Sequence, residues 1–206
     1  MKKNFKIFLF WFIHCTWGIL MTLIGAVAAL ALLITNHKPK KFGYMIYFVV
    51  GYNWGGVCLG PFFLVSDDCD ELGSKTHESG HSIYQGLLFG PFFPLVVAIP
   101  SALRYHLFNC KTQKDKYQLS GIIVGVTLEL GLLFILFAII FSVLTLYIIG
   151  FAIIGYTVII SLWLFLSEIK RMGNDKYGYY DIWFERDASH YGLENYKKNK
   201  NILKYE

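Results

Sequence analysis

Charged residues are scarce in this chain of 206 residues: Asp, Glu, Lys and Arg make up 16% of it, whereas 55% of the residues are hydrophobic. Because soluble domains carry about a quarter charged residues, this scarcity argues against an ordinary soluble domain. The same composition excludes a disordered chain, a collagen-like chain and a coiled coil. No internal repeat or low-complexity tract breaks the sequence, and its length suits one compact domain over residues 1–206.

Two other absences narrow the function. The four cysteines form no C-x-x-C pair, which argues against a cysteine zinc knuckle and a redox dithiol. No arginine stripe with interleaved aromatics lies outside the apolar segments, which argues against a nucleic-acid partner. The net charge of +5 comes from lysine clusters such as Lys2–Lys6 and Lys38–Lys41. Clusters of this kind beside apolar runs are typical of flanks that face anionic membrane lipids.

Long apolar runs are what the sequence does have. Residues 5–34 and 119–168 far exceed the ~20 apolar residues that one membrane-spanning helix needs. The first run is too long for a signal peptide, whose apolar part covers about 7–15 residues, so we expect one spanning helix there. The second run predicts two spanning helices, 119–142 and 148–168, joined by a tight turn. Gly121 and Gly125 form a G-x-x-x-G pair that favours close packing of these helices.

The remaining segments predict smaller elements. Residues 42–66 are rich in Tyr, Phe and Val and are interrupted by Asn53, Gly55 and Gly56, a pattern that predicts a β-hairpin. We expect a helix over 75–89. We expect a re-entrant or short spanning segment over 90–108, which contains three prolines, and an amphipathic helix over 179–192 that ends at Gly192. The predicted fold class is a mainly α membrane protein. It has about three spanning helices, a re-entrant or interfacial helix, and a small β-hairpin.

The string His77-Glu78-Ser79-Gly80-His81 is the feature that carries chemistry. Two histidines four residues apart lie on one face of a helix and can bind one zinc ion. The glutamate after the first histidine points elsewhere around the helix and can reach a water molecule on the metal. The motif therefore predicts a Zn²⁺ site with His77 and His81 as ligands and Glu78 as the general base.

A catalytic zinc needs a third protein ligand, and the sequence leaves its identity open. The local extension with another histidine is absent, since positions 84 and 87 are Tyr and Leu. Glu185 on the predicted amphipathic helix is one candidate. Glu129 is an alternative, because an acidic residue inside an apolar helix is costly and is usually functional or paired. The acidic loop Asp67–Glu71 is a third possibility.

The two motifs together resemble those of membrane gluzincins. His77-Glu78-Ser79-Gly80-His81 followed by Glu185-Arg186-Asp187-Ala188-Ser189 is similar to the H-E-x-G-H … E-x-x-A-D arrangement of CAAX prenyl endopeptidases and HtpX-type heat-shock proteases. This resemblance implies a zinc peptidase in which His77, His81 and Glu185 bind the metal and Glu78 is the base. The likeness covers two short motifs and the apolar segments around them. With Gln85, the first motif also resembles small bacterial membrane proteins of the form H-E-x-G-H-x-x-Q, which imply no established activity.

The chain departs from the gluzincin pattern at one position. Ser189 stands where those proteins have an aspartate that supports a zinc-binding histidine. Asp181, Asp187 or His190 are the candidates to replace that aspartate. Residues that could stabilise a developing oxyanion are Tyr177, Tyr179, Tyr180 and His190.

Topology constrains this interpretation. His81 and Glu185 can share a metal only if an even number of crossings separates them, which holds if 119–168 crosses twice and 90–108 does not cross. The lysine-rich loop and tail then lie on one side, and the positive-inside tendency favours the cytoplasm. We therefore expect a multi-pass protein of the cell membrane that hydrolyses a peptide or a membrane protein. The alternatives are a non-catalytic scaffold or immunity-type protein with a structural zinc site, and a zinc hydrolase that acts on a lipid.

Overall fold

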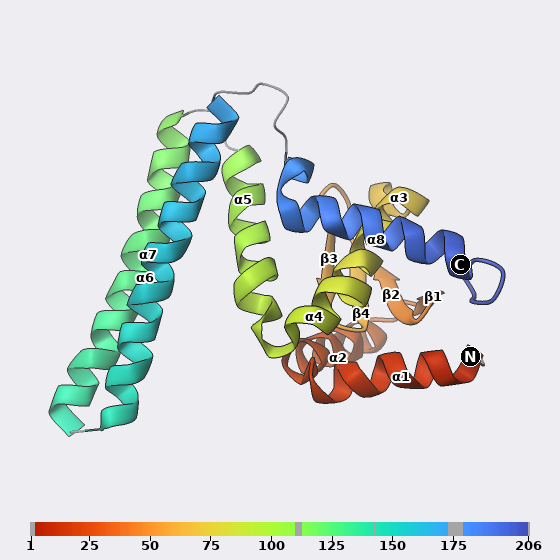
Figure 1. Ribbon diagram of the computed structural model, residues 1–206, viewed down its shortest axis with the longest axis horizontal. Helices are drawn as coiled ribbons and strands as arrows, with labels where there is room; N and C mark the ends of the chain where they lie inside the picture. Colours follow the sequence, from red (N-terminus) through yellow and green to blue (C-terminus); the bar gives the residue numbers. More distant parts are fainter. Residues whose placement is uncertain (1–2, 110–112, 142, 173–178, 206) are drawn as a thin grey trace. The chain divides into compact units, whose positions relative to one another are not determined.

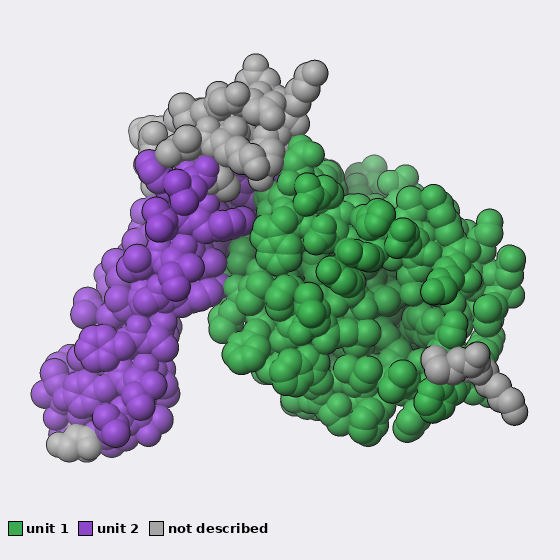
Figure 2. All heavy atoms as spheres, in the orientation of Figure 1, with its two compact units in different colours: residues 1–101, 180–206 green, residues 102–179 purple. Residues whose placement is uncertain are grey.

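A computed structural model describes residues 3–109, 113–141, 143–172 and 179–205. The chain is mainly helical and contains one small sheet (Figure 1). It divides into two compact units, coloured separately in Figure 2. The first, here called the sheet unit, comprises Met1–Ser101 and Tyr180–Glu206, and the second, the hairpin unit, is Ala102–Tyr179. The region predicted as one domain thus contains two separately packed parts.

The first apolar run forms two helices, α1 (Lys3–Thr16) and α2 (Ile19–Ile34), whose axes are bent by 101°. The run predicted as one helix over 5–34 is therefore a bent pair, which by length and composition is either a broken span or a re-entrant segment. The break falls at Trp17 and Gly18, and the Thr22 hydroxyl closes it by donating a hydrogen bond of 2.7 Å to the backbone oxygen of His14. Hydropathy reported the apolar length of this segment but carried no information about the bend.

The sheet has four strands in the order β1-β2-β4-β3. The strands are β1 (Lys40–Phe42), β2 (Met45–Val49), β3 (Gly56–Leu59) and β4 (Phe62–Val65). Two antiparallel pairs, β1–β2 and β3–β4, are joined by parallel pairing of β2 with β4. The single hairpin predicted over 42–66 is wrong, because each of its halves folds back on itself. Gly43 and Gly60 form the two tight turns, and each has a positive φ, which glycine adopts at little cost. Asn53 and Gly55 lie in the connection between the two strand pairs.

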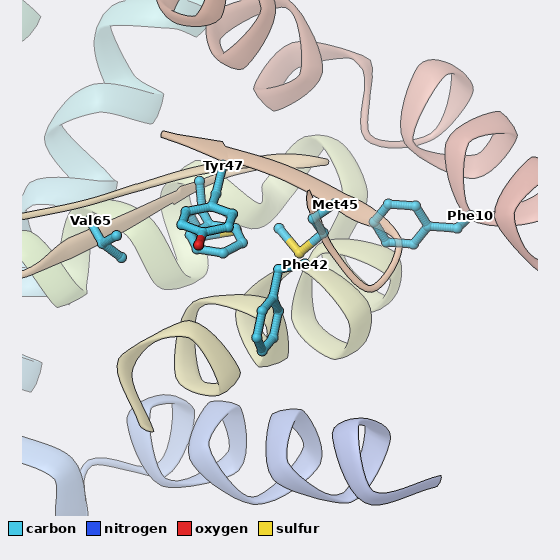
Figure 3. Packing of buried hydrophobic residues seen from close by; sticks show 7 residues of the cluster. Phe10, Phe42, Met45, Tyr47 and Val65 are labelled. Carbon is cyan, nitrogen blue, oxygen red and sulfur yellow. The ribbon is translucent and has the colours of Figure 1, made fainter. Parts of the chain in front are cut away.

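A compact aromatic core fixes the sheet (Figure 3). Tyr47 and Phe63, on neighbouring strands, stack with ring centroids 4.9 Å apart. Phe10 brings α1 into the same cluster, which Figure 3 shows beside Met45. In Figures 1 and 3, α1 lies on one side of the sheet and α8 (Trp183–Asn199) on the other. The sheet unit is thus layered, with α3 between the sheet and α8.

The predicted helix over 75–89 is present and starts earlier. It comprises α3 (Leu72–Gly80), a π-helical turn η2 (His81–Gly86) and α4 (Leu87–Phe89). Short helical turns η3 (Gly90–Phe92) and η4 (Pro94–Ala98) lead into α5 (Ile99–Asn109). The chain bends by 109° between Leu72–Phe92 and Pro94–His106. Gly90 has a φ of +50° at this bend, a conformation that glycine adopts at little cost.

The second apolar run forms α6 (Gln113–Phe141) and α7 (Leu144–Met172). Within them, Ser120–Ile140 and Leu144–Leu166 are long and apolar enough to cross a membrane. They pack through Gly131 and Gly150, since a Cβ on Gly150 would lie 2.8 Å from the Gly131 carbonyl oxygen. The predicted contact glycines, Gly121 and Gly125, have no described atom within 4 Å of an added Cβ. In this helix pair, the close contact forms where a glycine of one helix faces a glycine of the other.

The C-terminal helix follows a short turn, η5 (Tyr179–Asp181), and continues to Asn199 rather than ending at Gly192. In this helix Gly192 is a packing residue. An added Cβ on it would collide with the carbonyl oxygen of Thr76 in α3. The sequence predicts a helix end at Gly192 because glycine is common at such ends. In the structure this glycine instead allows α8 to pack closely on α3.

Candidate metal centre

The centre forms where α3 crosses α8 (Figure 1). Gly80, the small residue of the His77–His81 motif, faces Ala188, and a Cβ on Gly80 would collide with the Ala188 carbonyl oxygen. Gly192 faces Thr76 in the same way. The two contacts bring the helix backbones within van der Waals distance, which is how small residues permit close helix crossing. This close approach brings Glu185, at the start of α8, to the histidines.

Three side-chain atoms converge at this crossing. Nε2 of His77 lies 3.0 Å from Oε2 of Glu185, and Nε2 of His81 lies 3.4 Å from the same oxygen. The two histidine Nε2 atoms are 3.2 Å apart. Glu185 is completely buried, although isolated buried carboxylates are costly. His77, His81 and Glu185 together form a group that could hold a metal ion.

A second set of contacts orients the two rings. Nδ1 of His77 lies 2.8 Å from the Ser189 hydroxyl, and Nδ1 of His81 lies 2.8 Å from Oε1 of Gln85. Gln85 donates a hydrogen bond from its Nε2 to the backbone oxygen of Phe184, at 2.5 Å. Each ring is thus held at Nδ1 so that Nε2 faces Glu185. Contacts of this kind typically fix the orientation of metal-binding histidines.

Electrostatics within the group favour a charged carboxylate. Burial alone would raise the pKa of Glu185, but hydrogen bonds from His77 and His81 hold it well below its ordinary value. Burial alone would lower the pKa of His81, but the Glu185 carboxylate raises it above its ordinary value. The centre therefore keeps a negative charge that attracts cations, either protons on the imidazoles or a metal ion.

Glu78 lies beside this group, at a cleft. It is buried, and burial raises the pKa of its carboxyl. A Cβ on Gly56, the first residue of β3, would lie 2.6 Å from Oε1 of Glu78. The cleft has a volume of about 320 Å³ and is lined by residues of the β2–β3 loop, β3, α3, η5 and α8, among them Gly56, His77, Glu78, Tyr180 and Ser189. His77 of the group that could hold a metal and Glu78 therefore line the same cleft.

The other two ligand candidates proposed from the sequence, Glu129 and the acidic loop, do not belong to the described group of His77, His81 and Glu185. Glu129 lies on α6 in the hairpin unit. The acidic loop Asp67–Glu71 contributes Cys69 and Glu71 to the cleft wall, and its Asp70 pairs with two lysines. Among the described residues, the group that could hold a metal takes its carboxylate from Glu185 and from neither of these alternatives.

The proposed replacements for the missing aspartate are also outside the centre. Asp187 pairs loosely with Arg186, and the exposed His190 lies 3.5 Å from Glu194. Asp181 is exposed. Ser189 itself makes the contact with His77 that an aspartate was expected to make. Of the tyrosines considered, Tyr180 lines the cleft, with its ring centroid 5.5 Å from that of His77. Tyr179 belongs to the hairpin unit, and Tyr177 lies outside the described residues.

Sequence reasoning missed the roles of Gln85 and Gly56. Gln85 stands four residues after His81, one helical turn away, so its reach to that ring could have been inferred from spacing. Gly56 carried no such signal, because its contact with Glu78 depends on how the sheet packs on α3. Comparisons with protein-family models, with curated proteins and with solved structures find no match for this chain.

Proposed function

We propose that this chain is a zinc metallohydrolase, anchored in a membrane, that cleaves peptide bonds. The supporting observation is the triangle of Nε2 of His77, Nε2 of His81 and Oε2 of Glu185, with sides of 3.0, 3.2 and 3.4 Å. In a tetrahedral zinc site with ligands at about 2.0–2.2 Å, neighbouring ligand atoms lie roughly 3.3 Å apart. The triangle matches one face of such a tetrahedron.

The donor set supports a catalytic rather than a structural site. Structural zinc sites are closed by four protein ligands, whereas catalytic ones have three and an open position. Here three protein atoms converge, and His77 also lines the cleft. When bound, zinc lowers the pKa of a coordinated water towards about 7 and polarises a carbonyl group.

Glu78 is the residue we assign to proton transfer. Its position at the cleft, next to His77 in sequence, lets it accept a proton from the attacking water and deliver it to the leaving amine. Its burial raises the pKa of the carboxyl, and a carboxyl whose pKa lies closer to neutral exchanges protons more readily in both directions. Tyr180 lines the same cleft and is a candidate for stabilising negative charge on the substrate oxygen.

Three features favour a peptide substrate. β3 is an edge strand of the sheet, and it begins at Gly56 beside Glu78. An extended peptide can add to such an edge by main-chain hydrogen bonds. The cleft wall also contains Glu71, Ser74 and three glycines, which suits amide groups better than acyl chains. The resemblance of the two motifs to membrane gluzincins agrees with this assignment.

The experiment compares the parent protein with Glu78→Gln, which keeps the side-chain shape but removes the base. Both proteins, purified in detergent, should contain about one zinc per chain. Only the parent should cleave a mixed peptide library, and the variant should be slower by about 10²–10⁴-fold, the usual contribution of a general base. His77→Ala serves as the control without metal.

Each contrary result has a distinct meaning. Equal cleavage by the parent and Glu78→Gln would remove Glu78 from the mechanism. A parent that binds zinc but cleaves no peptide, while hydrolysing lipids, would reassign the substrate. A parent that binds zinc and hydrolyses neither class would favour the structural-site alternative.

A further inference from the structure

The outer surface of the α1–α2 pair is apolar. Its most exposed side chains include Ile34 at 73% and Val27 at 70%. On α1 the exposed apolar residues are Phe5, Phe8, Leu9 and Phe12, and on α2 they are Ile19, Leu20, Leu23, Ile24, Val27, Leu30, Leu33 and Ile34. Soluble proteins rarely expose contiguous apolar patches of this kind. We call this set of residues the α1–α2 face.

Both ends of the α1–α2 pair are attached to the same C-terminal tail of the sheet unit. Near the start of α1, Nζ of Lys6 donates a hydrogen bond of 3.4 Å to Oδ1 of Asn199. Beyond the end of α2, Phe42 forms a β-bridge with Tyr205, and the Gly43 amide donates to the Lys204 oxygen at 2.9 Å. The two attachments are only a few residues apart in the tail. A helix that crosses a bilayer would separate its ends by about 30 Å of hydrocarbon.

The bend between the helices is fixed by packing. Trp11 donates a hydrogen bond of 3.0 Å from Nε1 to the backbone oxygen of Tyr44, which fixes α1 to the β1–β2 turn. Gly25 of α2 packs so closely on the end of β3 that a Cβ there would collide with the Leu59 oxygen. Straightening the pair into one spanning rod would break both contacts. The bend is therefore part of the fold of the sheet unit.

Length and charge identify what covers the α1–α2 face. α2 has 16 residues without a charge, about 24 Å of helix, which is less than the ~20 residues needed to cross a bilayer. Lys3 near the beginning of α1 and Lys38 and Lys41 after α2 are exposed, and such lysines pair with anionic lipid headgroups. The same chain carries two helices that are apolar enough to cross a membrane. A lipid bilayer is therefore the apolar environment that we expect to cover the α1–α2 face.

We propose that the α1–α2 face is embedded in one leaflet of a membrane containing anionic lipids, and that α1–α2 enters and leaves on the same side. The N-terminus and the histidines of α3 then share one side, because α1–α2 does not cross. The C-terminal tail shares that side too, since α6 and α7 together make two crossings between α3 and α8. The lysine clusters at the N-terminus, at 38–41 and in the tail also fall on that side, which is the cytoplasmic side by the positive-inside tendency.

This arrangement places the metal centre close to the headgroups but in water. β3 contacts α2 near Leu59 and Glu78 at Gly56, and a four-residue strand spans roughly 10 Å. The cleft is at the Gly56 end. A substrate bond would therefore be cut in the aqueous layer beside the membrane and not within the hydrocarbon.

Two native cysteines test the proposal with matched labels. Cys15 is exposed on α1, and Cys69 lies at the cleft. Each is kept alone, with the other cysteines replaced by alanine, labelled with an environment-sensitive fluorophore and reconstituted into phosphatidylcholine–phosphatidylglycerol vesicles. Brominated lipids should quench the Cys15 label several-fold more than the Cys69 label, and aqueous iodide should show the reverse order. A circular dichroism spectrum and a melting temperature equal to those of the parent protein check that each variant is folded.

The outcomes that would overturn the proposal are specific. Iodide quenching of the Cys15 label equal to that of Cys69 would mean that the face lies in water. Protection of Cys15 from both quenchers, together with cross-linking between copies, would mean that a second copy covers it.

A second measurement does not depend on labels in the helices. Lys3→Cys and Lys38→Cys, placed in the cysteine-free background, are exposed to a membrane-impermeant maleimide added outside sealed vesicles of known orientation. Both positions should react from the same side, to the same extent. Reaction from opposite sides would show that α1–α2 crosses the membrane and would refute the proposal even if the fluorophore results agreed with it.

Discussion

Both units of the molecule pack helices through paired small residues, but the contacts serve different ends. In the hairpin unit, Gly131 meets Gly150, which joins two apolar helices that follow each other in sequence. In the sheet unit, Gly80 meets Ala188, which joins helices more than 100 residues apart and brings Glu185 to the histidines. Close contact between small residues can therefore join two helices that are neighbours in sequence, or it can bring the residues of a site together from distant parts of the chain. Which of the two results depends on the side chains beside the contact.

The units also differ in where their acidic residues lie. Glu129 lies on an apolar helix that could cross a membrane, whereas Glu185 is buried between two imidazoles. Removing each of these two carboxylates in turn, and measuring zinc content and cleavage, is the most direct way to test this contrast.

We expect the largest effect from Glu185→Ala. Removing one of the three proposed ligands should lower zinc affinity by more than the roughly 10–100-fold that loss of a supporting contact causes. Peptide cleavage should disappear as well. Glu129→Gln, the matched change in the hairpin unit, should leave zinc content and cleavage unchanged. Zinc loss on Glu129→Gln, with zinc retained on Glu185→Ala, would reverse the assignment. Metal analysis of the purified proteins makes the measurement.

The helix crossings provide the next comparison. Gly80→Ala places a methyl group against a backbone oxygen that cannot move without shifting α8, so we expect destabilisation of about 1–3 kcal/mol or more and weaker zinc binding. Gly131→Ala should weaken the packing of α6 on α7 but leave the zinc affinity unchanged. Gly121→Ala should change neither property. Thermal unfolding in detergent and zinc titration measure these effects, and a Gly80→Ala protein with parental zinc affinity would contradict the role given to the crossing.

The contacts that orient the imidazoles should have a smaller effect. Ser189→Ala and Gln85→Ala each remove a partner of Nδ1, and we expect a loss of roughly 10–100-fold in zinc affinity with the fold intact. Ser189→Asp should restore or improve binding, because a carboxylate is a common partner at this position. Competition with a chelator of known affinity gives the values, and unchanged affinity in both alanine variants would refute the orienting role.

The smallest effect concerns pH and the Asp70 ion pairs at the rim of the sheet. Burial alone would raise the pKa of Asp70, but hydrogen bonds from Lys40 and Lys75 hold it below its ordinary value of 3.8. A lowered pKa means that the pairs stabilise the fold fully above 3.8 and lose their effect as the pH falls below 3.8 and through the lowered pKa of the folded protein. Asp70→Asn should therefore cost about 1 kcal/mol or less at pH 7. The difference in melting temperature from the parent should shrink as the pH falls below 3.8 towards the lowered pKa of Asp70, and a difference that stays constant over this range would contradict this account.

Much of the candidate site could be predicted because its chemistry is local. Helical spacing alone puts His77 and His81 on one face, and the rarity of suitable distant carboxylates left few candidates for the third position. Glu185 could be favoured only through the resemblance of its motif to other proteins. Nothing in the spacing says that Gly80 and Gly192 allow α3 and α8 to approach. The contact of Ser189 with His77 likewise depends on that approach, whereas the contact of Gln85 with His81 follows from their spacing.

The fold divides in the same way between local and distant causes. The sequence by itself determined that 119–168 forms two long apolar helices, because hydropathy and length act residue by residue within one segment. It did not determine the bend at Gly18, the parallel pairing of β2 with β4, or the convergence of Glu185 on the histidines. Those features arise from contacts between residues far apart in the chain, whose free energy depends on which surfaces meet and which only the tertiary structure decides.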